Sequence, residues 1–94
     1  MNIFVTGGFG FIGSNFILKF INESNMNILN YDKLTYAGNL DNLKSINDCN
    51  NYDYIIGDIC DKKKLNESIA NFKPNIILHF AAESHVDRSI ENPF

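Results

Sequence analysis

The feature that most constrains the fold is a glycine-rich turn near the start of the chain, TGGFGFIG at positions 6–13. A short apolar run precedes it, which is typical of a strand buried on both faces of a parallel sheet. Apolar residues at helical spacing follow it, between Phe11 and Asn22. In such a unit Gly7 permits the tight turn, Gly10 lets backbone amides approach a pyrophosphate, and Gly13 lets the helix pack closely against the sheet. The turn predicts a dinucleotide site, against the plainer alternative of a purely structural turn.

An acidic residue, Asp32, ends a second expected strand, residues 27–31, about 20 residues beyond the glycine turn. A carboxylate at this position accepts hydrogen bonds from the 2′-hydroxyl of the adenosine ribose and repels a 2′-phosphate, so it favours NAD over NADP. The alternative is that Asp32 only caps the loop that follows it. The positive charge of the neighbouring Lys33 would soften the discrimination between the two cofactors.

The rest of the chain continues the alternation of strands and helices. Residues 33–51 are polar, with one helical turn expected around Leu40–Ile46, and a third strand follows at 52–56. Asp61 is a candidate cap for a second amphipathic helix, and a fourth strand is expected at 75–80. Short connections between such elements imply right-handed crossovers. We therefore expect an α/β partial Rossmann fold, with a parallel sheet of about four strands in the order 3-2-1-4 and flanking helices.

The length of the chain limits what this fold can contain. A doubly wound sheet of six or seven strands needs more than 94 residues. We expect residues 1–94 to be an amino-terminal NAD-binding portion, truncated before the remaining strands and the catalytic, substrate-binding part. In the order 3-2-1-4 the fourth strand has one unpaired edge with apolar side chains. The isolated chain is therefore expected to self-associate through this exposed edge.

Three further motifs accompany the glycine turn: DKLTYAGNL at 32–40, GDICD at 57–61 and HFAAESHVDRS at 79–89. Together with the turn they resemble the dTDP-glucose 4,6-dehydratases of the extended short-chain dehydrogenase/reductase family, in register from Met1 to the final residue. The resemblance implies NAD as the cofactor, a nucleotide-sugar substrate (dTDP-glucose) and a homodimer for the full-length protein. Phe9 is a mild departure, since a smaller residue commonly occupies this position in the family.

The resemblance also implies which residues bind NAD. Phe11 and Ile12 would lie beside the pyrophosphate, with Gly7, Gly10 and Gly13. Residues after the second and third strands would hold the adenosine, with Asp58 accepting from the adenine amino group and Ile59 on its ring: Asp32, Lys33, Leu34, Thr35, Ala37, Gly38, Asp58 and Ile59. Residues after the fourth strand would line the middle of the cofactor and the nicotinamide ribose: Phe80, Ala81, Ala82, Glu83 and Ser84.

The last of these segments would also face the sugar nucleotide, as the resemblance implies, through Ser84, His85, Val86, Asp87 and Arg88. Two interpretations of Arg88 stay open, because its guanidinium suits either a substrate diphosphate or a surface ion pair with Asp87.

The chemistry of the family requires residues that this sequence lacks. Oxidation of the sugar uses a tyrosine followed four residues later by a lysine, and elimination uses an adjacent Asp-Glu pair. Neither pattern occurs in the chain. We therefore expect no catalytic residue here and no turnover by the chain alone. Two alternatives remain: a fragment of another family member, such as a UDP-sugar epimerase or decarboxylase, or a naturally short, non-catalytic nucleotide-binding module.

Composition excludes several other classes of function. A net charge of −3 argues against nucleic acid or an anionic membrane as the main partner. Two isolated cysteines, together with the absence of a signal peptide or long apolar stretch, favour the cytoplasm.

Cys60, His79 and His85 fit no zinc motif, so no metal is expected, and His79 is interpreted as a satisfied histidine in or at the end of a strand. The abundance of asparagine is interpreted as a genomic coding bias.

Overall fold

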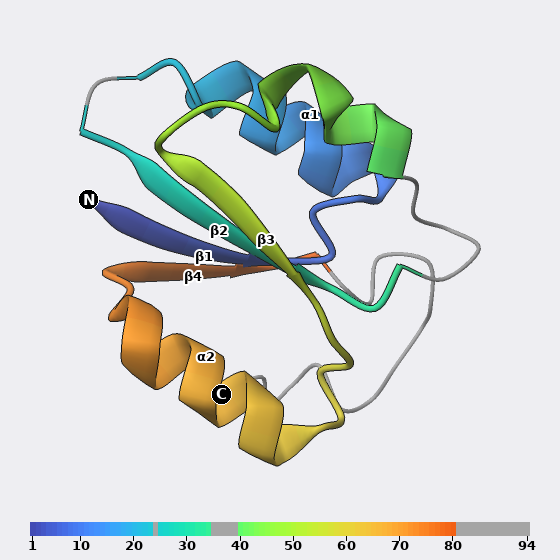
Figure 1. Cartoon of the computed structure of the whole chain (residues 1–94), viewed down its shortest axis with the longest axis vertical. Helices are drawn as coiled ribbons and strands as arrows, with labels where there is room; N and C mark the ends of the chain where they lie inside the picture. Colours follow the sequence, from blue (N-terminus) through green and yellow to red (C-terminus); the bar gives the residue numbers. More distant parts are fainter. Residues whose placement is uncertain (24, 35–39, 81–94) are drawn as a thin grey trace.

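The sheet has the topology that the sequence predicts. The computed structural model describes residues 1–23, 25–34 and 40–80. They contain a sheet of four parallel strands in the order β3-β2-β1-β4, which confirms the expected order (Figure 1). The strands are β1 (Asn2–Thr6), β2 (Asn27–Asp32), β3 (Tyr52–Ile56) and β4 (Ile76–His79). The only differences at the strand ends are that Asp32 belongs to β2 and that β4 is one residue shorter at each end than expected.

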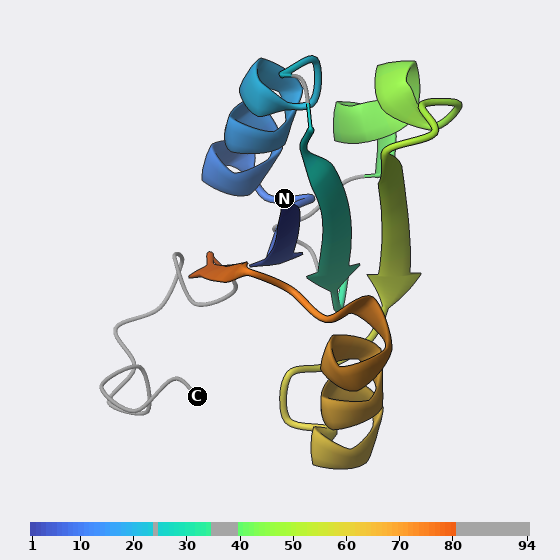
Figure 2. The same cartoon turned by 90° about the vertical axis from the view of Figure 1, so that its left-hand side faces the viewer.

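Helices cover both faces of the sheet. The α-helix α1 (Phe11–Phe20) and the 3₁₀ helix η1 (Leu40–Ile46) lie on one face, and α2 (Lys62–Phe72) lies on the other (Figures 1 and 2). Each face has its own buried apolar cluster, and neighbouring strand residues such as Ile28 and Leu29 enter different clusters. Successive strand side chains point to opposite faces, so burial of both faces explains why the strands are nearly continuous apolar runs.

The helix ends follow local chemistry. The Asp61 carboxylate accepts from the backbone N–H three residues on at 3.2 Å, which confirms the predicted cap of α2. Lys73, in the left-handed region with φ of 55°, ends that helix. Helix α1 ends at Phe20, although the apolar spacing continues to Ile21, because the Glu23 N–H donates to the Phe20 carbonyl in a turn that leads towards β2. The helical segment expected at 40–46 is found as η1, which is kinked at the buried Leu43, where φ is −120°.

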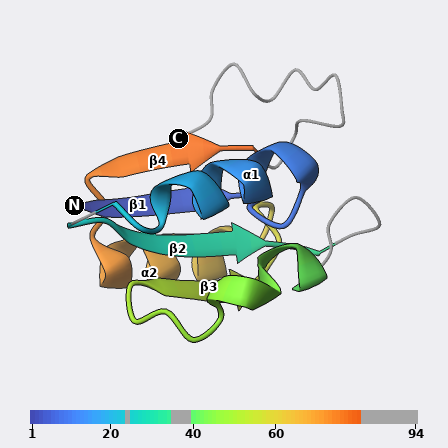
Figure 3. The ribbon, with the colours of Figure 1, turned by 90° about the horizontal axis from the view of Figure 1, so that it is seen from above.

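Asparagine side chains tie together the amino ends of the strands. Asn2 is central: its side-chain N–H donates to the last carbonyl of α2 at 2.9 Å, and its oxygen accepts from Asn27 at 3.0 Å. Its backbone N–H donates to Asn75 at 2.8 Å. Asn51 donates to two carbonyls in the connection between α1 and β2, at 2.7 and 3.0 Å. We call Asn2, Asn27, Asn51 and Asn75 the asparagine network. Figure 3 shows the amino ends of the strands gathered at one side of the sheet, away from the turn into α1.

Within the part of the chain that the structure describes, no helix combines the length and the apolar character needed to cross a lipid bilayer.

Candidate dinucleotide-binding site

The segments that follow the strands begin at one edge of the sheet. Beyond the ends of the strands, the Gly7 N–H donates to the Tyr31 carbonyl at 3.0 Å, and the Gly57 N–H donates to the Asp32 carbonyl at 2.9 Å. The amide after β4 donates in the same way to the last residue of β1, at 2.8 Å. Ligands of open α/β sheets bind outside the carboxyl ends of the strands. The predicted cofactor residues that the structure describes are therefore gathered along that edge.

The backbone of the glycine turn packs closely against the start of α1 and against β2. Gly7 has φ of 76°, a conformation that strongly favours glycine. A Cβ atom at Gly13 would lie 2.4 Å from the Gly7 carbonyl oxygen. The sequence predicts that Gly13 allows close packing of the helix on the sheet, and the structure refines this: the helix start packs on the backbone of the turn. A Cβ atom at Gly8 would lie 2.2 Å from the Asn30 side chain, a constraint that the glycine spacing does not reveal.

Two side chains of β2 hold successive amides of the turn. The Gly8 N–H donates to Asn30 Oδ1 at 2.9 Å, and the Phe9 N–H donates to Asp32 Oδ2 at 2.8 Å. Asn30 is completely buried, and its Nδ2 donates to the Tyr52 hydroxyl of β3 at 3.3 Å. Burial raises the pKa of Tyr52 to about 12, so this hydroxyl stays neutral. Sequence reasoning missed Asn30; the available signal was an amide two residues before the acidic residue in an otherwise apolar strand.

The start of α1 leaves backbone donors for a ligand. Gly10 is the N-cap and provides no side-chain hydrogen bond to the first turn. The first amides of a helix have no acceptor within the helix, and together with the dipole they favour an anion. The next two side chains, Phe11 and Ile12, are 77% and 53% exposed. This geometry suits a phosphate group above the turn, which is the site that the sequence predicts.

Asp32 has two backbone partners. Its Oδ2 accepts from the Phe9 N–H, and its Oδ1 accepts from the Leu34 N–H at 2.8 Å. Leu34 has φ of 60°. The contact with Leu34 is the loop cap that the alternative interpretation predicts. A loop cap alone does not explain the contact with the glycine turn. That contact fixes the carboxylate beside the proposed phosphate position. Each carboxylate oxygen accepts more than one hydrogen bond, so Asp32 still has acceptor sites for ribose hydroxyls.

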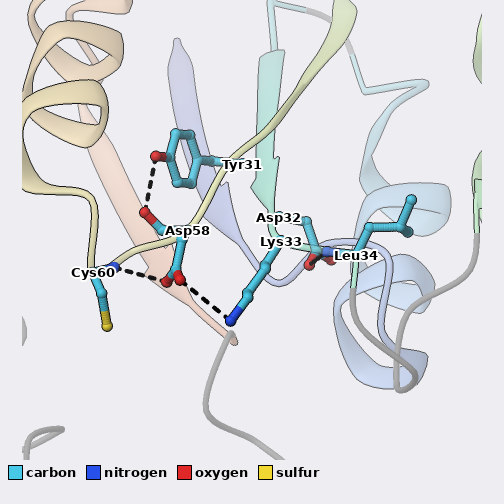
Figure 4. Close-up of polar contacts among 6 residues, drawn as sticks. All are labelled: Tyr31, Asp32, Lys33, Leu34, Asp58 and Cys60. Atoms are coloured by element: carbon cyan, nitrogen blue, oxygen red, sulfur yellow. Dashed lines mark hydrogen bonds and ion pairs between the residues drawn. The ribbon is translucent and has the colours of Figure 1, made fainter.

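Asp58 is anchored at the end of β3 and pairs with Lys33 (Figure 4). Its Oδ1 accepts from the Cys60 N–H at 2.9 Å, its carbonyl accepts from the Tyr31 hydroxyl at 3.0 Å, and its Oδ2 lies 3.3 Å from Lys33 Nζ. The Cys60 amide, and after it the Lys33 ammonium, hold the pKa of Asp58 below its usual value. The adjacent Ile59 packs partly against the apolar cluster beneath α2. The two residues predicted for adenine therefore flank the end of β3.

The carboxyl end of β4 carries a polar pair. Thr6 Oγ1, fully buried at the end of β1, lies 2.6 Å from His79 Nδ1. Burial lowers the pKa of His79. This contact confirms the interpretation of His79 as a satisfied histidine at the end of a strand. Phe80, which follows it, packs its ring on Phe16 of α1 with centroids 5.8 Å apart.

Several predicted residues lie outside the described residues. These are Thr35, Ala37 and Gly38 after β2, and Ala81, Ala82, Glu83, Ser84, His85, Val86, Asp87 and Arg88 after β4. Of the predicted cofactor residues, the structure brings together those in the glycine turn and those at the ends of β2 and β3.

Comparison with known proteins gives consistent matches over this chain. The family model described as GDP-mannose 4,6 dehydratase matches residues 4–94. A probable dTDP-glucose 4,6-dehydratase of Sinorhizobium fredii is 51% identical over 90 residues, which are 96% of this chain and 25% of that protein. The chain thus spans about a quarter of the length of this relative.

Solved structures agree with this match. The dTDP-glucose 4,6-dehydratase of Bacillus anthracis, in complex with NAD, has a TM-score of 0.85 and 47% identity, covering 89% of this chain and 27% of that one. The Streptomyces venezuelae enzyme of the same name, also with NAD bound, has a TM-score of 0.81 and 39% identity, covering 98% of this chain and 30% of that one. The fold seen here is therefore the one found at the matching part of these proteins.

Proposed function

The chain belongs to the GDP-mannose 4,6 dehydratase family, and from this premise we propose that it is the NAD-binding portion of a dTDP-glucose 4,6-dehydratase. Such an enzyme converts dTDP-glucose to dTDP-4-keto-6-deoxyglucose and water, a step of deoxysugar biosynthesis. NAD supplies a transient acceptor for the substrate hydride. The 94 residues are not expected to catalyse the reaction alone, since they lack the Tyr–Lys spacing and the Asp-Glu pair.

One observation carries the proposal: the pair of hydrogen bonds from the glycine turn to β2. Asn30 and Asp32 hold the amides of Gly8 and Phe9, so the turn is fixed without using the first amides of α1. Those amides suit the pyrophosphate, and Asp32 suits the adenosine ribose. An ordinary structural turn needs neither an uncapped helix start nor an acidic residue facing it.

The remaining described residues fit the same ligand. Phe11 and Ile12 are exposed beside the expected pyrophosphate, as a surface covered by ligand requires. Asp58 and Ile59, at the end of β3, suit the adenine. Thr35, Ala37 and Gly38 are proposed at the ribose, and residues 80–84 at the middle of the cofactor and the nicotinamide ribose. Residues 84–88 are proposed to face the sugar nucleotide.

Titration calorimetry with NAD tests the cofactor assignment. We expect Asp32→Ala to weaken NAD binding by about ten- to a hundredfold, the usual effect of losing hydrogen bonds to a charged group. Asp48→Ala is the matched control, because Asp48 is an exposed carboxylate outside the site. Unchanged affinity in Asp32→Ala, or the absence of any binding heat in the longer protein that carries this sequence, would refute the assignment.

A substrate panel tests the proposed reaction. The full-length protein is given dTDP-glucose, UDP-glucose and GDP-mannose, and formation of the 4-keto-6-deoxy product is followed. We expect turnover of dTDP-glucose to exceed that of the other two. Preferential turnover of a UDP-sugar would instead identify a different member of the family.

We also propose how the protein assembles and where it acts. The full-length enzyme is expected to be a cytoplasmic homodimer. The 94-residue chain alone is expected to self-associate, because within the described residues β4 pairs with β1 on one side and is only partly buried. Light scattering of the isolated chain at high concentration checks this, and a clean monomer would contradict it.

A further inference from the structure

We propose that Asp58 is a specificity-determining residue, which preserves the preference for NAD over NADP by holding the Lys33 ammonium away from Asp32. This inference rests on the proposed function, and it gives Asp58 a role in addition to the adenine contact. The two cofactors differ only by a phosphate on the 2′-oxygen of the adenosine ribose. The charge around Asp32 therefore decides between them.

The residue next to Asp32 carries the opposite charge. Asp32 would repel a 2′-phosphate, but the next residue is a lysine, whose flexible stem carries a charge that would attract one. Neighbouring residues of an extended chain point in opposite directions. Figure 4 shows the Lys33 side chain extending to Asp58, whereas the Asp32 carboxylate faces Leu34.

Asp58 is the fixed partner of the pair and Lys33 the movable one. The Asp58 carboxylate is held by the Cys60 amide at 2.9 Å, and its backbone carbonyl is held by the Tyr31 hydroxyl at 3.0 Å. Tyr31, on β2, is itself completely buried in the apolar cluster beneath α2. The Lys33 side chain is 61% exposed and has its ion pair with Asp58 at 3.3 Å. The position of the ammonium is therefore set from the end of β3.

The charges explain the consequence for the ligand. Asp32, Lys33 and Asp58 together carry two negative charges and one positive charge, so the site as a whole repels a phosphate dianion. Without the Asp58 charge, the carboxylate of Asp32 and the ammonium of Lys33 balance. Lys33 is then also free to move towards a 2′-phosphate. Both effects favour NADP.

The experiment measures the ratio of the NADP and NAD dissociation constants at low ionic strength, in the longer protein that carries this sequence. Four variants are compared: the unchanged sequence, Asp58→Asn, Lys33→Met, and the double variant. Asparagine keeps an acceptor for the Cys60 amide and removes only the charge. The adenine contact is common to both cofactors, so its loss cancels in the ratio.

We expect Asp58→Asn to lower this ratio by about two- to fivefold, which corresponds to the free energy of an exposed ion pair. In the Lys33→Met background the same substitution should lower the ratio less, because only the loss of the Asp58 charge then acts and no ammonium is released towards the 2′-phosphate. An unchanged ratio in Asp58→Asn overturns the inference, and so does a gain for NADP that is equally large with and without Lys33. Absence of NAD binding by the unchanged protein instead overturns the proposed function, and this inference with it.

Discussion

The two ends of the sheet use short polar side chains for opposite purposes. At the amino end, the asparagine network connects strand, helix and loop backbones, so its side-chain amides are spent on holding the protein together. At the carboxyl end, Asn30 and Asp32 hold the amides of Gly8 and Phe9, in addition to their contacts with Tyr52 and Leu34. The helix start beside them has no side-chain cap, and Phe11 and Ile12 stay exposed.

If the proposed site is correct, this difference separates the residues that stabilise the fold from the residues that bind NAD along a single sheet. A substitution at the amino end should weaken the fold and leave the affinity for NAD unchanged. A substitution at the carboxyl end should affect both, because the hydrogen bonds that complete the fold there also place the amides proposed to bind NAD. Substitutions on the two sides therefore test whether the division is real.

The largest effect is expected for Gly13→Ala. In an open helix this change gains about 1 kcal/mol in helix propensity. Here the new Cβ atom would lie 2.4 Å from a backbone oxygen that cannot move aside, so we expect a loss of about 3 kcal/mol in unfolding free energy. Affinity for NAD should fall at least about tenfold, because a 1.4 kcal/mol displacement cost already has that effect.

Urea unfolding and calorimetry measure the two quantities. Asn15→Ala is the control, since Asn15 is exposed on the same helix and its loss should change stability by less than about 0.5 kcal/mol. A Gly13→Ala protein more stable than the unchanged one would show that the turn adapts. The carboxyl end of the sheet would then not be a tightly fixed region.

The next largest effect is expected for Asn30→Val. Valine has a similar size, but it leaves the buried Gly8 N–H without its acceptor, which costs about 2 kcal/mol of stability. We expect affinity for NAD to fall as well, since the turn loses one of its two anchors. Tyr52→Phe is the control, because it removes only the bond at 3.3 Å and leaves Gly8 held. If both variants bind NAD equally well, Asn30 serves stability alone.

The sequence predicts the elements of this fold better than the contacts at its site. The sequence predicts all four strands, α1, α2 and η1 near their observed positions, because glycines and polar residues separate short apolar runs. The role of Gly13 was predicted in part, since its spacing from Gly7 is a known pattern. The atoms that an added Cβ at Gly13 would contact depend on the conformation of the turn, and the spacing of the glycines does not predict that conformation.

Contacts between strands are the main part that sequence reasoning misses. Asn30 looks like one more asparagine in a chain with a coding bias, and only the register of β1 and β2 places it beside Gly8. Lys33 and Asp58 belong to separate motifs, and their ion pair depends on the parallel pairing of β2 with β3. The coding bias likewise gives no reason for the positions of the asparagine network.

At the amino end, Asn51→Ala provides the sharpest contrast. It removes the donor to two carbonyls in the connection between α1 and β2, and we expect a loss of about 1 kcal/mol in unfolding free energy. The dissociation constant for NAD should change by less than about twofold, because distant sites are coupled by about 0.4 kcal/mol or less in binding free energy. A loss of affinity as large as that of Asn30→Val would break the division between the two ends.

The smallest effect is a pH dependence confined to the carboxyl end. Burial lowers the pKa of His79 in the folded state, so the unfolded chain binds the proton more readily. The stability from the neutral form is therefore fully present above the unfolded value of about 6.5 and is lost as the pH falls through the lower folded value. Thermal unfolding between pH 7.5 and 5.5 measures this loss.

His79→Gln should flatten the pH dependence of stability, because glutamine keeps a hydrogen bond to Thr6 without titrating in this range. Asn51→Ala, in contrast, should lower the stability equally at every pH and keep the slope. If the slope persists without His79, the acid sensitivity arises elsewhere in the chain, and the Thr6–His79 pair serves only to join β1 to β4.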